Sequence, residues 1–202
     1  RVAEGGGRPD RKLGWRSGGG GIAQFRAEAL NPEHPMMRST VQNPDIYFQI
    51  REANNGFYDA LPGIVEDYMK KISAITGREY HLFNYYGAPD AEEIVIAMGS
   101  VSGAAEEAVD YLNAQGRKTG YVQVHLFRPF SVEHLFRAIP KSVRKIAVLD
   151  RCKEMGSNGG PLYQDICTAF SGSGMSPVIV GGRYGLSSKD TDPTQIIAVF
   201  DN

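Results

Sequence analysis

The sequence predicts a three-layer α/β fold, in which helices cover both faces of a mostly parallel five-stranded sheet. Two observations predict it. Short, continuous apolar runs rich in branched residues recur along the chain, as expected for strands buried on both faces of a parallel sheet. Segments with apolar residues at helical spacing alternate with these runs, and glycine or proline separates the two kinds. Right-handed crossovers on a parallel sheet satisfy such an alternation.

The clearest strand–turn–helix unit runs from Glu93 to Leu112. Its run from Ile94 to Met98 predicts a strand buried on both faces. Gly99 then frees the backbone to turn, and Ser100 or Ser102 can cap the first amides of a helix. The apolar residues of that helix fall on one side at helical spacing: Ala104, Ala105, Ala108, Val109 and Leu112.

The same turn, from Gly99 to Gly103, allows a second interpretation. The amides of a helix N-terminus point outward beyond the end of a parallel strand and can bind an anion, so this turn is a candidate nucleotide site. The spacing is not G-x-G-x-x-G, and no lysine follows as in a P-loop. A tight turn whose small residues allow close packing is therefore the favoured interpretation.

Residues 24–78 are predicted to lead into the α/β domain. Two prolines between Asn31 and Pro35 bar a helix and indicate an extended crossing. Apolar residues at helical spacing predict one long helix from Asp45 to Thr76, kinked or broken near Tyr58 to Leu61 by Pro62. Residues 1–23 contain many glycines and arginines and few apolar residues, which predicts a disordered or non-native head.

The α/β domain is predicted to span residues 79–202. Strands are expected at residues 80–86, 94–98, 121–127, 144–150 and 177–185, the first of them at the sheet edge. Helices are expected after the second strand, from Ser131 as a cap through Arg137, from Pro161, and from Pro193 with Asp192 as its cap. His81 has no partner nearby in the sequence, which favours a surface or packing role over a ligand role.

The composition argues against several classes of partner. With 22 basic and 23 acidic residues the net charge is −1, so neither a nucleic-acid footprint nor a membrane-surface patch is indicated. No apolar run approaches the roughly 18 residues that span a bilayer. The two cysteines, Cys152 and Cys167, form no C-x-x-C pair and cannot assemble a zinc or iron–sulfur site by themselves. A reducing compartment is expected, either the cytoplasm or a reducing organelle of a eukaryote.

The segment after the strand at 144–150 contains the densest group of polar residues. Arg151 and Lys153 follow that strand, and Arg183, Tyr184 and Lys189 follow the last one. Because the carboxyl ends of parallel strands meet at one edge of a sheet, these five side chains are expected to gather there. Two interpretations stay open, an anion site or a salt-bridged contact with a neighbouring domain. Cys152 lacks a histidine nearby in the sequence and is expected to be an inert thiol.

Several segments in order, from about Gln24 to Asn202, resemble pyruvate:ferredoxin (flavodoxin) oxidoreductase. The resemblance is carried by Asn43–Gln49, Tyr85–Glu92, Ala97–Ser100, Phe127–Phe130, Val148–Arg151 and Gly181–Asp190. The region resembled is the second domain of that multidomain enzyme, which is similar to the C-terminal domain of transketolase. A scaffold domain is therefore expected at residues 79–202. The sequence departs from the family pattern at Cys152, where threonine is usual, and at Met155, where proline is usual, so the resemblance leaves the role of this loop open.

The resemblance implies a parent enzyme that oxidatively decarboxylates pyruvate with coenzyme A to acetyl-CoA and CO2 and reduces ferredoxin or flavodoxin. It implies thiamine diphosphate, Mg²⁺ and [4Fe-4S] clusters held by other domains, a homodimeric parent, and an electron acceptor that binds elsewhere. This chain has no cluster cysteines and no Gly-Asp-Gly motif for a magnesium diphosphate. No catalytic residue or metal ligand is expected in it, and the fragment alone is expected to be inactive.

Two alternatives compete with this interpretation. One is a free-standing α/β module that binds a nucleotide at Gly99 to Gly103. The other is a transketolase-like subunit that acts in trans. The first interpretation requires a thiamine-type domain upstream and a ferredoxin-type domain downstream. Sequence beyond either end would therefore separate it from the alternatives.

Overall fold

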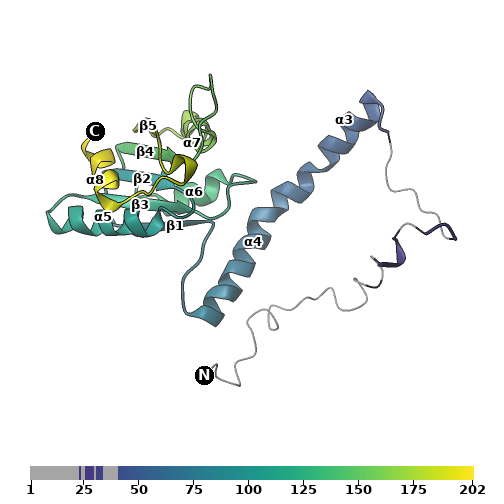
Figure 1. The fold of residues 1–202 in the computed structure, drawn as a ribbon, viewed down its shortest axis with the longest axis horizontal. Helices are drawn as coiled ribbons and strands as arrows, with labels where there is room; N and C mark the ends of the chain where they lie inside the picture. Colours follow the sequence, from purple (N-terminus) through teal and green to yellow (C-terminus); the bar gives the residue numbers. More distant parts are fainter. Residues whose placement is uncertain (1–22, 24–25, 30, 34–40) are drawn as a thin grey trace.

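The computed structural model describes residues 23, 26–29, 31–33 and 41–202 (Figure 1). The head predicted at residues 1–23 lies outside the described residues except for Ala23. The end of the crossing predicted between Asn31 and Pro35 also lies outside them. The account below concerns the described part of the chain.

The core of the α/β domain is a five-stranded sheet in the order β1-β3-β2-β4-β5. Strands β2 (Glu93–Ala97), β3 (Thr119–Val124), β4 (Lys145–Asp150) and β5 (Val178–Arg183) are parallel, and β1 (Phe83–Gly87) lies antiparallel at the β3 edge. The predicted fold class and the edge position of the first strand are confirmed. The predicted strand at 80–86 begins three residues later, because His81 and Leu82 bond to neighbouring side chains and loops instead of the ladder.

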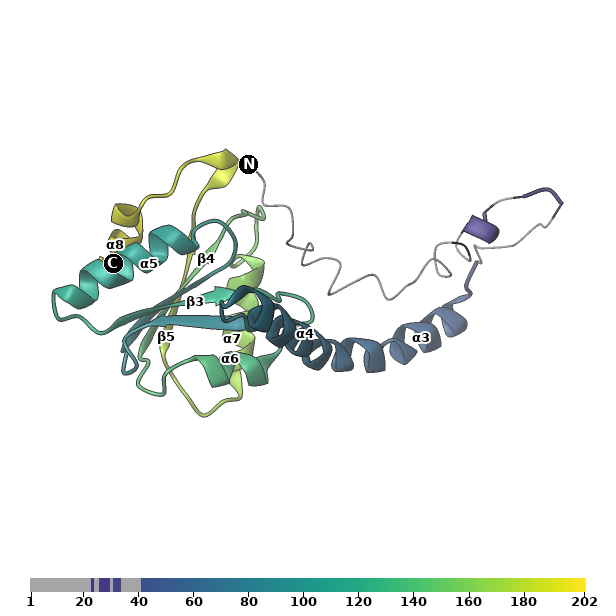
Figure 2. The same cartoon turned by 90° about the horizontal axis from the view of Figure 1, so that it is seen from below.

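The sheet buries a different core on each face, which makes the domain three-layered (Figure 2). Ile94 and Ile96 of β2 face the core covered by α6 (Val132–Ala138) and α7 (Pro161–Ser171). Val95 and Ala97 face the core covered by α5 (Ser102–Ala114) and α8 (Pro193–Asp201). Successive side chains of a strand point to opposite faces, so one apolar run supplies both cores.

The predicted helix caps are only partly correct. Asp192 caps α8 as predicted, since its Oδ1 accepts a hydrogen bond of 3.0 Å from the Gln195 amide. The caps predicted for α5 are wrong, because the chain enters the helix at Val101 and the Ser102 hydroxyl donates back to the Gly99 carbonyl instead. Ser131 does occupy the cap position of α6, but its hydroxyl bonds to His134 Nδ1 at 2.7 Å and not to a backbone amide.

The long helix predicted from Asp45 to Thr76 is two helices, α3 (Pro44–Ala53) and α4 (Asn55–Thr76). The break lies at Asn54, and the break predicted near Tyr58 to Leu61 is wrong. Asn54, Asn55 and Gly56 are weak helix formers in succession. Pro62 removes one backbone hydrogen bond, and α4, which is fully described, has no buried residue, so water can reach the released carbonyl. Gly77 ends α4 in the left-handed conformation, as its predicted stop required.

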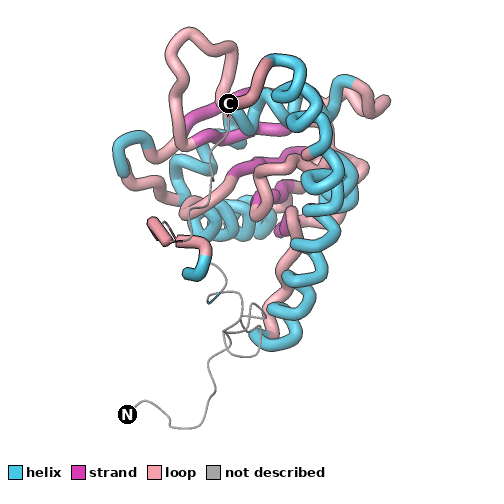
Figure 3. Tube along the Cα trace, turned by 90° about the vertical axis from the view of Figure 1, so that its right-hand side faces the viewer, coloured by secondary structure: helices cyan, strands magenta, loops and turns pink. Residues whose placement is uncertain are grey.

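Helices α3 and α4 form a rod that projects from the α/β domain (Figures 1 and 3). Only the second half of α4 lies against the domain, where Val65 and Met69 pack on the core near β1. None of the residues in these two described helices is buried. The rod is therefore attached to the domain over a short length of one helix.

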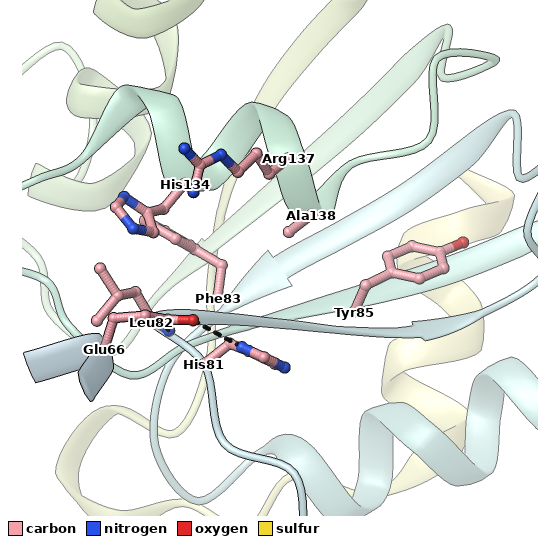
Figure 4. Close-up of a pocket in the computed structure, with 8 residues that line it drawn as sticks. All are labelled: Glu66, His81, Leu82, Phe83, Tyr85, His134, Arg137 and Ala138. Atoms are coloured by element: carbon pink, nitrogen blue, oxygen red, sulfur yellow. Dashed lines mark hydrogen bonds and ion pairs between the residues drawn. The ribbon is translucent and has the colours of Figure 1, made fainter. Parts of the chain in front are cut away.

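A carboxylate supplies the polar part of that attachment. Glu66 Oε1 lies 2.9 Å from His81 Nδ1, and Glu66 Oε2 accepts a bond of 3.3 Å from the Leu82 amide (Figure 4). Burial raises the pKa of the Glu66 carboxyl group, but these two hydrogen bonds and the nearby imidazoles outweigh it, so the pKa lies below its ordinary value. The negative charge of Glu66 thus helps to hold α4 on the segment that leads into β1.

We expect Glu66→Ala to lower the free energy of unfolding by about 1–2 kcal/mol at neutral pH, because two hydrogen bonds to a partly buried carboxylate are lost. The depressed pKa means that this contribution is present above the ordinary value of 4.5 and disappears as the pH falls through the lower folded value. Urea unfolding at neutral and at stepwise lower pH measures the difference. Asp67→Ala is the matched control, since that carboxylate is exposed; a difference from wild type that persists in acid would contradict the assignment.

A second expectation concerns the glycine at the end of β1. Gly87 has φ 126°, and a Cβ there would lie 2.5 Å from the Thr119 carbonyl oxygen. We expect Gly87→Ala to destabilise the chain by roughly 3 kcal/mol through strain and overlap together. Gly116→Ala is the control, because Gly116 also has positive φ but no described atom within 4 Å, and it should cost about 1 kcal/mol. Equal melting temperatures of the two variants would show that backbone conformation alone matters.

Candidate functional site

The five predicted polar side chains divide between two cavities at the carboxyl edge of the parallel strands. Arg151, Tyr184 and Lys189 line a cavity of about 190 Å³ together with Ser100, Asp190 and residues near them. Arg183 lines a neighbouring cavity of about 360 Å³, beside Tyr163 and the loop before α7. Lys153 is exposed and lines neither cavity. The structure thus brings three of the five side chains together.

Arg151 and Tyr184 connect the ends of three strands. The Arg151 guanidinium donates from Nη1 to Ser100 Oγ at 3.1 Å and from Nε to the Gly185 carbonyl at 3.2 Å. The buried Tyr184 hydroxyl donates to the Met98 carbonyl, just beyond β2. Burial raises the pKa of Tyr184, so it stays a protonated donor. Both side chains are committed to holding the loops of β2, β4 and β5 in place.

Asp150 occupies the N-terminus of α7. Its side chain is buried, Oδ1 accepts from the Leu162 amide at 3.0 Å, and Oδ2 accepts from the Tyr163 amide at 3.1 Å. A Cβ at Gly160 would lie 2.1 Å from Asp150 Oδ2, so only glycine fits before Pro161. The amides that an external anion would use are therefore already bonded to a carboxylate of the protein.

The turn from Gly99 to Gly103 is closed by its own hydrogen bonds. Gly99 has φ 84°, and its carbonyl accepts from the Ser102 hydroxyl at 2.9 Å. A Cβ at Gly99 would lie 3.7 Å from the Tyr184 hydroxyl oxygen, which is ordinary contact. A Cβ at Gly103 would meet no described atom within 4 Å, so close packing does not explain that glycine. The tight-turn interpretation therefore applies at Gly99, because a positive φ favours glycine.

Three of the predicted cations are without a partner in the described part of the chain. The side chains of Lys153, Arg183 and Lys189 form no hydrogen bond or ion pair with any described residue. Arg117, by contrast, is paired twice, since its Nη2 bonds to Glu93 Oε2 at 2.7 Å and its Nη1 bonds to Asp201 Oδ1 at 2.6 Å. The edge thus presents positive charge that suits a carboxylate or a phosphate. Asp190 is the acidic residue that shares the smaller cavity with Lys189.

A larger cavity, of about 450 Å³, lies between β1 and α6, beside Glu66 of α4 (Figure 4). Sequence reasoning missed its organisation, because the Glu66 partner of His81 lies on another element. The signal in the sequence was Glu66 itself, a carboxylate between Val65 and Met69 on the packing side of α4. His134 bonds to Ser131 and Arg137 to Glu133, so the polar side chains have partners on the same or adjoining elements. This cavity belongs to the attachment of α4.

The described residues also limit the chemistry that the chain can perform. No group of three or more His, Cys, Asp or Glu side chains among them could hold a metal ion. Cys152 is exposed and forms no disulfide bond within the described part of the chain. Within the described part of the chain, no helix combines the length and hydropathy needed to cross a membrane. The arrangement offers an electrostatic surface, with no paired acid and base or activated nucleophile assembled at the edge.

Comparison with known proteins identifies the family. The model for pyruvate:ferredoxin oxidoreductase core domain II matches residues 91–196. The pyruvate-flavodoxin oxidoreductase of Enterobacter agglomerans is 64% identical over 181 residues, which is 90% of this chain and 15% of that protein. The pyruvate:ferredoxin oxidoreductase of Moorella thermoacetica is 55% identical over 181 residues, with 90% and 16% covered.

Among solved structures, 2-oxoglutarate:ferredoxin oxidoreductase from Magnetococcus marinus aligns with a TM-score of 0.49 at 18% identity, over 84% of this chain and 25% of that one. The chain spans 15% to 16% of the length of the two curated relatives. The resemblance predicted from the sequence is confirmed by the family match and by these identities. The chain belongs to the pyruvate:ferredoxin oxidoreductase core domain II family.

Proposed function

We propose that this chain is a scaffold segment of a multidomain oxidoreductase that converts pyruvate and coenzyme A to acetyl-CoA and CO2 and reduces ferredoxin or flavodoxin. The observation that carries the proposal is the 64% identity over 181 residues to a pyruvate-flavodoxin oxidoreductase. Within that enzyme, residues 24–78 are a helical lead-in and residues 79–202 a domain of the transketolase C-terminal type. The family match at residues 91–196 falls inside the second of these segments.

The cofactors of such an enzyme belong to other domains in this proposal. Thiamine diphosphate with Mg²⁺ and [4Fe-4S] clusters require carboxylate, amide or cysteine ligands in a defined cluster. The described residues do not fit these groups, because they contain no candidate metal cluster and the α7 N-terminus is filled by Asp150. The enzyme is a homodimer of the long polypeptide in a reducing compartment such as the cytoplasm, and its electron acceptor binds to other domains.

Activity measurements test the proposal. The full-length protein that carries this chain should reduce flavodoxin or ferredoxin when pyruvate and coenzyme A are both present. The 202-residue chain alone should show no such activity, bind no thiamine diphosphate and, after reconstitution with iron and sulfide, show no absorbance near roughly 400 nm, where Cys-ligated clusters absorb. Activity of the isolated chain, or a full-length protein that oxidises a different 2-oxoacid and leaves pyruvate untouched, would contradict it.

We also propose a role for the cationic edge defined by Lys153, Arg183 and Lys189. These side chains pair with acidic residues of an adjoining domain, because they form no ion pair with any described residue of their own chain. Arg151 and Tyr184 hold the loops behind them. The alternative is that the edge helps to hold the phosphates of coenzyme A.

Alanine variants of the full-length protein separate these two roles. We expect Arg183→Ala combined with Lys189→Ala to weaken domain association by roughly 2 kcal/mol, seen as a lower melting temperature, with the KM for coenzyme A unchanged. Lys141→Ala is the control, since Lys141 precedes β4 at the opposite edge of the sheet. A rise in the KM for coenzyme A alone, with unchanged melting and pyruvate kinetics, would reverse the assignment.

A further inference from the structure

The rod formed by α3 and α4 carries a continuous apolar stripe on its exposed side. Two rows of exposed residues repeat at intervals of seven, and together they define the stripe: Ile50, Phe57 and Ile64, and Tyr68 and Ile75. A repeat of seven residues keeps side chains on one side of a helix and is the spacing with which helices pack along one another. Phe57 is 77% exposed, Ile64 50% and Tyr68 49%.

The stripe is distinct from the side of α4 that packs on its own domain. Val65 and Met69 contact the core and Glu66 bonds to His81. Each residue is rotated by about 100° from the one before it, so Val65 and Met69 lie about a quarter-turn from Ile64 and Tyr68. The α/β domain therefore covers one side of α4 and leaves the stripe uncovered.

At two positions next to the stripe, no contact within the described chain explains the presence of glycine. Gly56 and Gly63 lie inside α4, one residue before Phe57 and Ile64, and glycine destabilises a helix relative to alanine. A Cβ at either position would meet no described atom within 4 Å. Space without side chains beside large apolar residues allows a second helix to come close, because the distance between packed helices depends on the side chains at the contact.

The comparisons show that the rod has a counterpart in much longer relatives. A match of 181 residues in a chain of 202 necessarily includes residues 44–76, so both helices are part of the longer relatives. The core domain II match begins at residue 91, after α4 has ended. The rod thus belongs to the long polypeptide, of which this chain covers 15%, and not to the core domain alone. A parallel pair of identical rods would place Lys71, which follows Ile64 by seven residues, against its own copy.

We infer that the stripe is a docking surface for an apolar helix of another domain of the same long polypeptide. This inference rests on the proposed function, since it requires the chain to be a segment of a multidomain enzyme. The exposed aromatic and aliphatic side chains are then the anchors, and Gly56 and Gly63 allow the close approach. The rod connects the core domain to the rest of the enzyme through its uncovered side.

Hydrogen exchange of α4 in the full-length protein that carries this chain tests the inference. We expect the amides from Phe57 to Tyr68 to exchange at least tenfold faster in Phe57→Asp combined with Ile64→Asp than in the wild type. Phe48→Asp is the matched control, because Phe48 is 68% exposed but lies about 200° around the helix from Ile50. Exchange as fast in the wild type as in the double variant would overturn the docking surface.

A second variant tests whether faster exchange comes from a lost partner or only from a less stable helix. Gly63→Leu raises helix propensity and meets no described atom, yet fills the space beside the stripe, so it should also speed exchange in the full-length protein. Unchanged exchange in this variant would count against close approach of a partner helix. If the slow amide exchange of α4 is lost when the protein is diluted until it is monomeric, the stripe contacts a second copy and the inference is overturned. Wild-type protein that protects α4 but does not oxidise pyruvate would contradict the proposed function and leave the contact standing.

Discussion

The carboxyl edge of this domain depends on the buried carboxylate of Asp150. A charge with almost no exposure is costly unless hydrogen bonds replace its water, and here the first amides of α7 supply them. The bond fixes where α7 starts relative to β4, and it requires glycine at position 160. It also directs the next residue, Arg151, outward to Ser100 and Gly185, so that three loops form one surface. A helix N-terminus that could have been an anion site is instead a structural joint.

The cationic side chains at this edge fall into two groups, those that bond within the domain and those that do not. Arg151 donates to the loops of its own domain, whereas the side chains of Lys153, Arg183 and Lys189 have no partner among the described residues. A surface built from a rigid base and unpaired cations is suited to recognition by charge. This arrangement agrees with a segment that positions other domains and leaves catalysis to them.

The two ends of the described chain differ in how they are held. The α/β domain has a closed core on each face of its sheet, with Ile94 and Val95 pointing into opposite layers. The rod is held by the packing of Val65 and Met69 and by hydrogen bonds of Glu66 and Ser73, while much of its apolar surface is exposed. Ile46, Tyr47, Phe48 and Phe57, which the sequence placed in the lead-in, are all among these exposed side chains. An isolated helix with such a surface gains most of its stability from packing on a partner.

The sequence alone determined the elements of the α/β domain, their order and the fold class, because apolar periodicity and the positions of Gly99, Pro161 and Asp192 act locally. It determined the family through the resemblance of several segments in order, from Asn43–Gln49 to Gly181–Asp190. Only the tertiary structure decided which distant groups meet. It paired Glu66 with His81, turned Asp150 into a helix cap, and placed Arg183 in a different cavity from Arg151 and Lys189. It also moved the helix break from the proline to Asn54. These outcomes depend on contacts and on solvent exposure across the fold, which spacing along a chain does not encode.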